Sequence, residues 1–267
     1  MNRRSRSLLV PLAVLATLGL SACSTADAPA GSSSPSSSAD ADVSGSITVF
    51  AAASLQQTFT TLGKQYETAH PGASIRFSFA GSSDLVTQIQ NGAPADVFAA
   101  ADQANMTKLT SGDLVTGSPR AFATNTLEIA VAPGNPRGIG DLDDLTAPGV
   151  QLVTCAAPVP CGAATAKVES ASGVDLEPVS EEQSVTDVLG KVESGQADAG
   201  LVYVTDVRGA GGKVDGVPFD ESSKAVNTYP IGVLRESHDP ELAQAFSEYV
   251  RSAAGQRVLS DAGFGKP

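Results

Sequence analysis

The chain has 267 residues, and its 29 acidic and 17 basic side chains give a formal net charge of −12. This balance argues against a nucleic-acid partner, because proteins that bind nucleic acid need a basic surface. It also means that any bound anion is not attracted by a surplus of lysines and arginines.

The first 22 residues have the pattern of a signal sequence. Arginines between positions 3 and 6 precede an apolar run over residues 8–20. The residues LSAC at 20–23 are similar to a bacterial lipobox, which would make Cys23 the first mature residue and its lipid-modified anchor. A plain secretory cleavage site is the alternative. We expect the leader to be removed and the protein to be held by Cys23 on the extracytoplasmic face of the cell membrane.

Residues 23–45 are rich in Ser, Ala, Pro, Asp and Gly. This composition buries too little apolar surface to offset the entropy of ordering the chain, so it predicts a disordered tether. Folding should begin at residue 46. The remainder is long enough for one large α/β domain or for two lobes of ordinary size.

Strand and helix patterns alternate through the rest of the chain. The stretch ITVFAAASL at 47–55 passes directly from strand formers to a helix start, where Ser54 and Gln57 match the S-x-x-Q capping box. Further strands are predicted over residues 74–79, 95–100, 127–132, 151–154, 199–204 and 226–234. Helices are predicted over residues 58–66, 85–90, 103–110, 161–170 and 184–193, with one or two more after Pro240. This alternation predicts mostly parallel sheets with helices on both faces.

Two cysteines, Cys155 and Cys161, remain once Cys23 is assigned to the lipid anchor. In an exported chain such a pair favours a disulfide over two free thiols. A metal site is disfavoured, because the chain has only two histidines, His70 and His238, and neither lies near the cysteines in sequence.

Four predicted helix starts follow a strand or a short loop, at Ser54, Ser82, Cys161 and Ser184-Val185. Free N–H groups and the helix dipole make such positions suitable for an anion at the carboxyl edge of an α/β sheet. Each serine taken singly also fits an ordinary N-cap. Tyr203 likewise fits a strand aromatic as well as a ligand donor.

Several motifs occur together in one order along the chain. They are ITVFAAASL at 47–55, FAGSSDLVTQI at 79–89, GAPADVF at 92–98, AAADQ at 99–103, PVPCG at 158–162 and GLVY at 200–203. In this combination the chain resembles the periplasmic molybdate-binding proteins of the ModA family, the solute-binding components of molybdate ABC importers. The resemblance covers residues 47–264.

The resemblance implies an oxyanion site made of neutral donors. The hydroxyl groups would come from Ser54, Ser82 and Tyr203, and the backbone N–H groups from Ser54, Ser82, Cys161 and Val185. Molybdenum would thus be bound only through the oxygens of the oxyanion. Cys161 departs from the family pattern, where a small residue is usual, but a backbone donor tolerates that change. A site with donors only has no acceptor for a proton, so it disfavours hydrogen phosphate.

The resemblance also implies the architecture and the partners. We expect a two-lobed α/β fold of the type II periplasmic-binding-protein kind, with the ligand in the cleft between lobes. Lobe 1 would comprise residues 46–124 and 228–267, and lobe 2 residues 125–227. The protein would capture molybdate or tungstate and deliver it to the membrane permease of an ABC importer. We expect a monomer that has no cofactor and is not an enzyme.

Other classes of function make different predictions. A binding protein of the same fold for sulfate or thiosulfate is the closest alternative. A ferric site is disfavoured, because none of the four tyrosines is adjacent to another. A serine hydrolase is disfavoured by the absence of G-x-S-x-G and S-x-x-K patterns. An adhesion or structural lipoprotein would have no cleft and no stabilising ligand.

Overall fold

A computed structural model describes residues 44–267 of the chain. The expected signal sequence, Cys23 and nearly all of the expected tether lie outside these described residues. The first strand begins at Gly45, which pairs with Ala73, so the fold starts one residue earlier than predicted. Within residues 44–267, no helix combines the length and the apolar character needed to cross a membrane.

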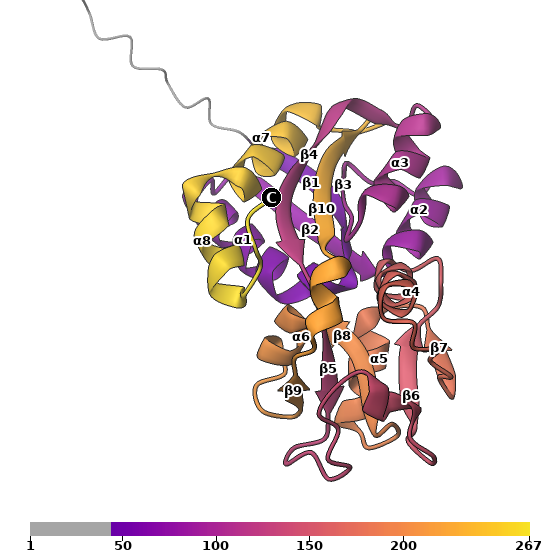
Figure 1. Ribbon diagram of the computed structural model, residues 1–267. Helices are drawn as coiled ribbons and strands as arrows, with labels where there is room; N and C mark the ends of the chain where they lie inside the picture. Colours follow the sequence, from indigo (N-terminus) through magenta and orange to yellow (C-terminus); the bar gives the residue numbers. More distant parts are fainter. Residues whose placement is uncertain (1–43) are drawn as a thin grey trace, which may run out of the picture. The chain divides into compact units, whose positions relative to one another are not determined.

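The first sheet has five strands in the order β2-β1-β3-β10-β4 (Figure 1). Its strands are β1 (Gly45–Ala52), β2 (Ala73–Ala80), β3 (Val97–Ala99), β4 (Val115–Asn125) and β10 (Asn227–Leu234). Its helices are α1 (Gln56–Ala69), α2 (Ser82–Gln90), α3 (Gln103–Ser111), α7 (Pro240–Arg251) and α8 (Ala253–Ala262). A short 3-10 helix, η1 (Ala53–Leu55), joins β1 to α1.

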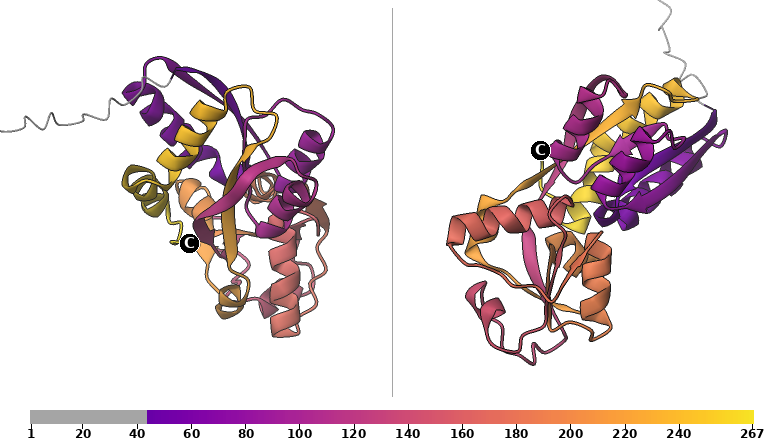
Figure 2. Two further views of the ribbon diagram at one scale, coloured as in Figure 1. Left: turned by 90° about the horizontal axis from the view of Figure 1, so that it is seen from above. Right: turned by 90° about the vertical axis from the view of Figure 1, so that its right-hand side faces the viewer.

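The second sheet also has five strands, in the order β7-β6-β8-β5-β9. Its strands are β5 (Leu127–Val131), β6 (Leu152–Cys155), β7 (Ser180–Glu182), β8 (Ala199–Tyr203) and β9 (Asp215–Val217). Its helices are α4 (Pro160–Ser172), α5 (Val185–Glu193) and α6 (Val204–Gly209), with 3-10 turns η2 (Asp143–Thr146) and η3 (Asp220–Lys224). Figure 2 shows the two sheets from two further directions, each with helices around it.

Alternating side chains of the first sheet pack against different helices. Val49 and Ala51 join the core cluster that holds buried residues of α1, α7 and α8. Phe50 lies between them in sequence and joins the other cluster, with buried residues of α2 and α3. Side chains alternate between the two faces of a strand, so this sheet is covered on both faces. The predicted α/β class with helices on both faces is therefore confirmed.

The proportion of parallel strands differs from the prediction, because both sheets are mixed. In the first sheet, β1 pairs in parallel with β2 and β3, whereas β10 runs antiparallel to β3 and β4. In the second sheet, β6 pairs in parallel with β7 and β8, whereas β5 runs antiparallel to β8 and β9. The strands that run opposite to the rest of their sheets are β10 in the first sheet and β5 in the second. Each is the first strand after the chain passes from one sheet to the other.

The chain passes between the sheets twice. It leaves the first sheet at Asn125, the last residue of β4, and enters β5 at Leu127. It returns at Asn227, the first residue of β10. The finer division into lobes, 46–124 with 228–267 and 125–227, stays a prediction.

Candidate functional site

A small pocket brings together all five residues that the sequence predicted as ligand donors. Its free space, including the part open to solvent, is about 190 Å³. Segments directly after the ends of β1, β2, β3 and β6, the start of α5 and the end of β8 form it. Its eleven lining residues are Ala52, Ala53, Ser54, Gly81, Ser82, Ala101, Val159, Pro160, Cys161, Val185 and Tyr203. Both sheets therefore contribute their carboxyl edges, as expected for a ligand site in an α/β protein.

Ser54 lies in the pocket but does not cap a helix. β1 extends to Ala52 and passes directly into the 3-10 turn, so Ser54 already has helical geometry, and no side chain caps η1 or α1. The predicted capping box with Gln57 is therefore wrong. The Ser54 hydroxyl lies 3.1 Å from the hydroxyl of Tyr229 instead. It is a candidate donor to a ligand rather than part of a helix cap.

Ser82 is the first residue of α2, and Gly81 occupies the N-cap position. The Ser82 side chain is 1% exposed. Its oxygen accepts a hydrogen bond from the backbone N–H of Ala101 at 3.1 Å. Because Gly81 is the N-cap, the N-cap alternative for this serine is wrong. The hydroxyl proton of Ser82 remains available, so a donor role is open to it. The hydroxyl of the next residue, Ser83, is buried and has no hydrogen-bond partner among residues 44–267.

Cys161 and Val185 lie in the first turns of α4 and α5, where N–H groups have no partner within the helix. The predicted disulfide between Cys155 and Cys161 is present, with the two Cα atoms 5.6 Å apart. It ties the end of β6 to the first turn of α4. The backbone N–H of Cys161 is thus attached to a strand end as well as to its helix.

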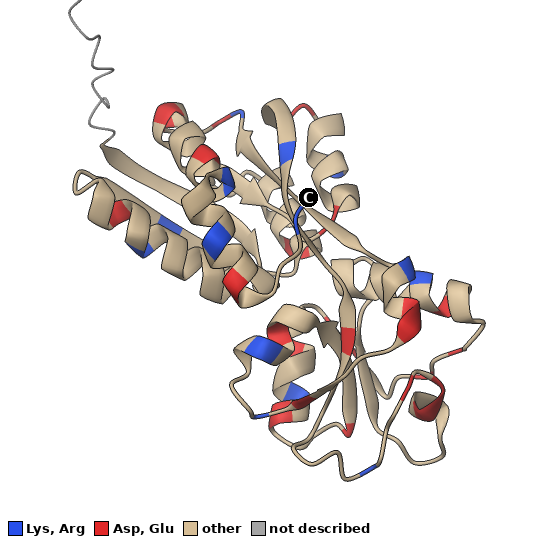
Figure 3. Ribbon diagram, turned by 60° about the vertical axis from the view of Figure 1, so that its left-hand side comes forward, with Lys and Arg blue, Asp and Glu red and all other residues tan. Residues whose placement is uncertain are grey.

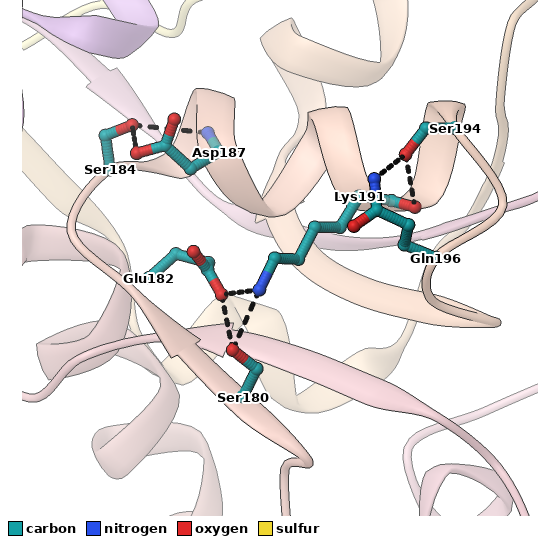
Figure 4. Close-up of polar contacts among 7 residues, drawn as sticks. All are labelled: Ser180, Glu182, Ser184, Asp187, Lys191, Ser194 and Gln196. Carbon is teal, nitrogen blue, oxygen red and sulfur yellow. Dashed lines mark hydrogen bonds and ion pairs between the residues drawn. The ribbon is translucent and has the colours of Figure 1, made fainter.

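The start of α5 is held by side-chain contacts between Ser184 and Asp187 (Figure 4). Ser184 is the N-cap, and its hydroxyl oxygen accepts from the backbone N–H of Asp187 at 3.2 Å. Further along α5, Lys191 forms an ion pair with Glu182 of β7. It also donates to Ser180 at 2.9 Å. These contacts attach the helix to β7 and so hold the N–H of Val185 in place.

Tyr203 ends β8 and is 1% exposed. Its hydroxyl oxygen accepts a hydrogen bond from the side-chain amide of Asn227 at 2.9 Å. Burial, together with the nearby Tyr229 and Asp206, raises the pKa of Tyr203 well above its usual value. The hydroxyl therefore keeps its proton and can act as a donor.

A layer of buried polar residues behind the pocket was not predicted. Asn125 and Asn227 pair with each other in register on β4 and β10, and each is 5% exposed. Asn125 donates to Thr205 at 2.8 Å and lies 3.5 Å from the hydroxyl of Tyr229. A signal was present in the sequence, because Asn-Thr occurs at both crossings next to strand formers, at 125–126 and 227–228.

The pocket has no charged residue among its lining side chains. Figure 3 shows the acidic and basic residues mostly on the helices and connecting loops around the two sheets. Within residues 44–267 there is no group of His, Cys, Asp and Glu that could hold a metal ion. What the pocket offers a ligand is a set of neutral hydroxyl and N–H donors. Hydrogen bonds from such donors to an ionised acceptor are stronger than those to a neutral one.

The contacts of the two serines differ from those of a catalytic nucleophile. A nucleophilic serine needs a neighbouring general base such as histidine. The partners of Ser54 and Ser82 are instead a tyrosine hydroxyl and a backbone N–H group. The site is therefore suited to holding an anion, not to activating a hydroxyl.

Comparison with known proteins agrees with this arrangement. Residues 47–265 match the family described as bacterial extracellular solute-binding protein. The chain is 52% identical over 222 residues to the molybdate-binding protein ModA of Mycobacterium tuberculosis, covering 83% of this chain and 85% of the relative.

Two solved structures share the fold. The periplasmic molybdate-binding protein of Azotobacter vinelandii has a TM-score of 0.72 at 21% identity, covering 83% of this chain and 99% of that one. The sulfate-binding protein SubI of Mycobacterium tuberculosis has a TM-score of 0.68 at 21% identity, covering 82% of this chain and 86% of that one. Together with the sequence matches, the two-lobed architecture shows that this chain belongs to the ModA family of bacterial extracellular solute-binding proteins.

Proposed function

We propose that the protein captures molybdate outside the cytoplasm and delivers it to the permease of an ABC importer. Tungstate, a tetrahedral dianion of nearly the same size, would share the site. The observation that carries this proposal is the pocket itself, where neutral donors from both sheets converge. The proposed donors are the hydroxyls of Ser54, Ser82 and Tyr203 and the N–H groups of Ser54, Ser82, Cys161 and Val185.

Such a site can hold a dianion without a positive side chain. Each donor replaces a water molecule of the ion's hydration shell, and a hydrogen bond to a charged acceptor contributes about 1.5–3 kcal/mol. Several donors held by strand ends and helix starts need little rearrangement when the ion binds. The ligand is transported cargo and the protein has no catalytic step of its own, as in the solute-binding proteins of its family.

Sulfate is the second candidate ligand, because the sulfate-binding protein SubI has the same fold. Sulfate and molybdate are both tetrahedral dianions and differ mainly in size. The sequence similarity to ModA favours molybdate. We further propose that the mature protein is a monomer tethered to the membrane by a lipid on Cys23, which keeps it near the permease.

Two neighbouring serines provide a matched test of the site. Ser82 lines the pocket, whereas Ser83 does not. We expect Ser82→Ala to weaken molybdate binding about 10- to 100-fold, because a hydrogen bond to the dianion is lost. Ser83→Ala should leave affinity unchanged, and it should not destabilise the fold, because it removes a buried hydroxyl without a partner.

The measurement is titration calorimetry of the purified wild-type protein and both variants with sodium molybdate. One-to-one binding by the wild type, weakened only by Ser82→Ala, supports the proposal. Failure of the wild type to bind molybdate would refute the function. Equal losses in the two serine variants would refute this location of the site.

A further inference from the structure

We infer that Asn227 is a positioning residue for the oxyanion site, because its side-chain amide holds the oxygen of Tyr203 from behind and turns the tyrosine's proton toward the pocket. Asn227 is not among the residues that line the pocket. It would act through Tyr203 without touching the ligand. The inference rests on the proposed function and names a determinant of its selectivity.

The direction of the hydrogen bond between Asn227 and Tyr203 follows from a third group. The amide nitrogen of Asn227 lies 2.8 Å from the backbone oxygen of Ala101. A carbonyl oxygen can only accept, so the atom facing it must be the NH₂ group. The same nitrogen lies 2.9 Å from the hydroxyl oxygen of Tyr203. The backbone oxygen of Pro160 lies farther from this nitrogen, at 3.5 Å. The NH₂ group therefore donates one hydrogen mainly to Ala101 and the other mainly to Tyr203.

This arrangement makes the Tyr203 hydroxyl a hydrogen-bond donor. It has a single proton, and its oxygen is already engaged as an acceptor by Asn227. Tyr203 is almost fully buried and lines the pocket. Its neighbour Tyr229 has contacts of its own, with Ser54 at 3.1 Å and Asn125 at 3.5 Å. The hydroxyl of Tyr229 is also a hydrogen-bond partner of Tyr203. With its oxygen engaged by Asn227, Tyr203 donates its proton to Tyr229 or, when a ligand is bound, to a ligand oxygen in the pocket.

A second pocket hydroxyl is oriented in the same manner. The oxygen of Ser82 accepts from the backbone N–H of Ala101, a group that can only donate. Ala101 thus receives a hydrogen bond from Asn227 through its carbonyl oxygen and donates one to Ser82 through its N–H. Ser82, which begins α2 just after β2 of the first sheet, and Tyr203, which ends β8 of the second sheet, both present protons to the ligand.

This orientation gives a physical basis for selectivity. Sulfate and hydrogen phosphate have the same charge and nearly the same size, but hydrogen phosphate carries a proton that needs an acceptor. With Asn227 in place, one acceptor position of the Tyr203 oxygen is taken and the hydroxyl proton faces the ligand, so this oxygen is a poorer acceptor for the proton of hydrogen phosphate. Without Asn227 the hydroxyl can rotate and accept, so the penalty for a protonated anion should decrease.

A purely structural role for Asn227 must be separated from this positioning role, since Asn227 also joins segments of both sheets. A double-mutant cycle with Tyr203→Phe makes the separation. We expect Tyr203→Phe to weaken molybdate binding about 10- to 100-fold and Asn227→Ala to weaken it about tenfold. In the Tyr203→Phe background, Asn227→Ala should change affinity by no more than about twofold, because there is no hydroxyl left to orient.

Asn125 provides the control, since it is equally buried and lies opposite Asn227 in register. The change Asn125→Ala removes contacts to Thr205 and Tyr229, so its effect on affinity should be the same with and without the Tyr203 hydroxyl. Asn227→Asp is the second variant, because it keeps the size of the side chain. Its added charge acts in both backgrounds and cancels in the cycle.

The readouts are titration calorimetry with molybdate, and competition by sulfate and hydrogen phosphate at matched ionic strength. The inference predicts that Asn227→Ala lowers the ratio of the hydrogen phosphate Kd to the sulfate Kd at least fivefold, and leaves it unchanged in the Tyr203→Phe background. Equal losses of affinity in both backgrounds, or an unchanged ratio, would overturn the inference alone. Absence of molybdate binding by the wild type would overturn the proposed function and the inference with it.

Discussion

Asp206 is a buried acid in contact with the pocket residue Tyr203, and its environment makes the protein's stability depend on pH. Its carboxylate accepts a hydrogen bond from the backbone N–H of Tyr203 at 2.9 Å. Burial raises the pKa of Asp206 from 3.8 to about 7, although the bond from Tyr203 opposes the rise. Between these pH values the folded protein holds a proton that the unfolded chain has released.

Because the folded protein binds this extra proton, its stability decreases as pH rises. The unfolding free energy should fall by about 1.4 kcal/mol per pH unit as pH rises from about 4 to about 7, and level off above. Over pH 5 to 7 the loss is roughly 2 to 3 kcal/mol. Asp206→Asn, which keeps an acceptor for Tyr203, should remove this slope.

Urea unfolding at pH 5, 6, 7 and 8 measures the unfolding free energies of the wild type and of Asp206→Asn. Burial also raises the pKa of Glu128, so the difference between wild type and Asp206→Asn, and not the wild-type slope alone, reports Asp206. If the unfolding free energy had the same dependence on pH in both proteins, the pH effect could not be assigned to Asp206.

At the level of single residues, the sequence was sufficient to name five of the eleven residues that line the pocket, but not their contacts. Ser54, Ser82 and Tyr203 were named through the family resemblance, and all three line one pocket. The capping role considered for Ser54 failed because the strand runs into a 3-10 turn without an extended residue at that point. Asn125 and Asn227 were missed because their importance depends on a pairing between strands about a hundred residues apart in the chain.

The disulfide is the feature that most directly connects a strand to a helix start in the site. Cys155 ends β6, Cys161 lies in the first turn of α4, and six positions separate them. Closing a loop of this length lowers the entropy of the unfolded chain and stabilises the fold by about 2 kcal/mol. The bond also restrains the segment that carries the N–H of Cys161.

Replacing both cysteines by serine should therefore have two effects. The unfolding free energy should fall by about 2 kcal/mol. Molybdate affinity should fall severalfold, because the N–H of Cys161 is less well placed. Calorimetry and urea unfolding of the double variant, compared with the wild type before and after reduction, measure both quantities. Unchanged affinity and stability would show that the disulfide has neither role.

At the level of elements, the alternation of strands and helices was largely predictable, but three strands, β4, β7 and β9, were not predicted. No strand was predicted over residues 115–125, yet β4 occupies them. The segment contains Pro119 and Gly117, and Gly117 has a positive φ of 65°. Both residues weaken a strand prediction, but a proline is tolerated where the strand lies at the edge of a sheet, as β4 does.

At the level of the whole folded chain, Gly81 lies where segments of the two sheets meet. Its backbone angles, φ −58° and ψ 139°, suit any residue. A Cβ atom at this position would lie 2.1 Å from the backbone oxygen of Gln183, which belongs to the connection between β7 and α5. A side chain here would therefore force the two segments apart.

This geometry predicts an effect on binding without an effect on folding. In Gly81→Ala the unliganded protein can relieve the clash by parting the two segments, whereas the ligand needs donors from both at once. We expect the melting temperature without ligand to be unchanged and molybdate affinity to fall at least tenfold, a cost of about 1.4 kcal/mol.

Gly190 is the matched control for Gly81. It lies inside α5, and a Cβ there would meet nothing within 4 Å. Gly190→Ala should leave affinity unchanged and raise stability by about 0.5–1 kcal/mol, as alanine is preferred within helices. Calorimetry and thermal unfolding of both variants measure these effects. If Gly81→Ala binds molybdate as tightly as the wild type, binding does not require the close approach of the segments that carry Gly81 and Gln183.

The mixed sheets illustrate what the order of elements leaves undecided. An alternating pattern predicts parallel strands, and β1, β2 and β3 follow it. The direction of β10 depends on how the chain returns from the second sheet, which no local pattern shows. Its place between β3 and β4 is a property of the complete fold.

The most direct test of the oxyanion site is the melting temperature of the purified protein in molybdate, tungstate, sulfate and phosphate at matched ionic strength. A ligand at a thousandfold excess over its Kd adds about 4 kcal/mol, which for a fold of this size is roughly 8 to 16 °C. We predict such a shift with molybdate and tungstate and little or none with sulfate and phosphate. A shift with sulfate alone, or no shift with any of the four anions, would contradict molybdate capture by this protein.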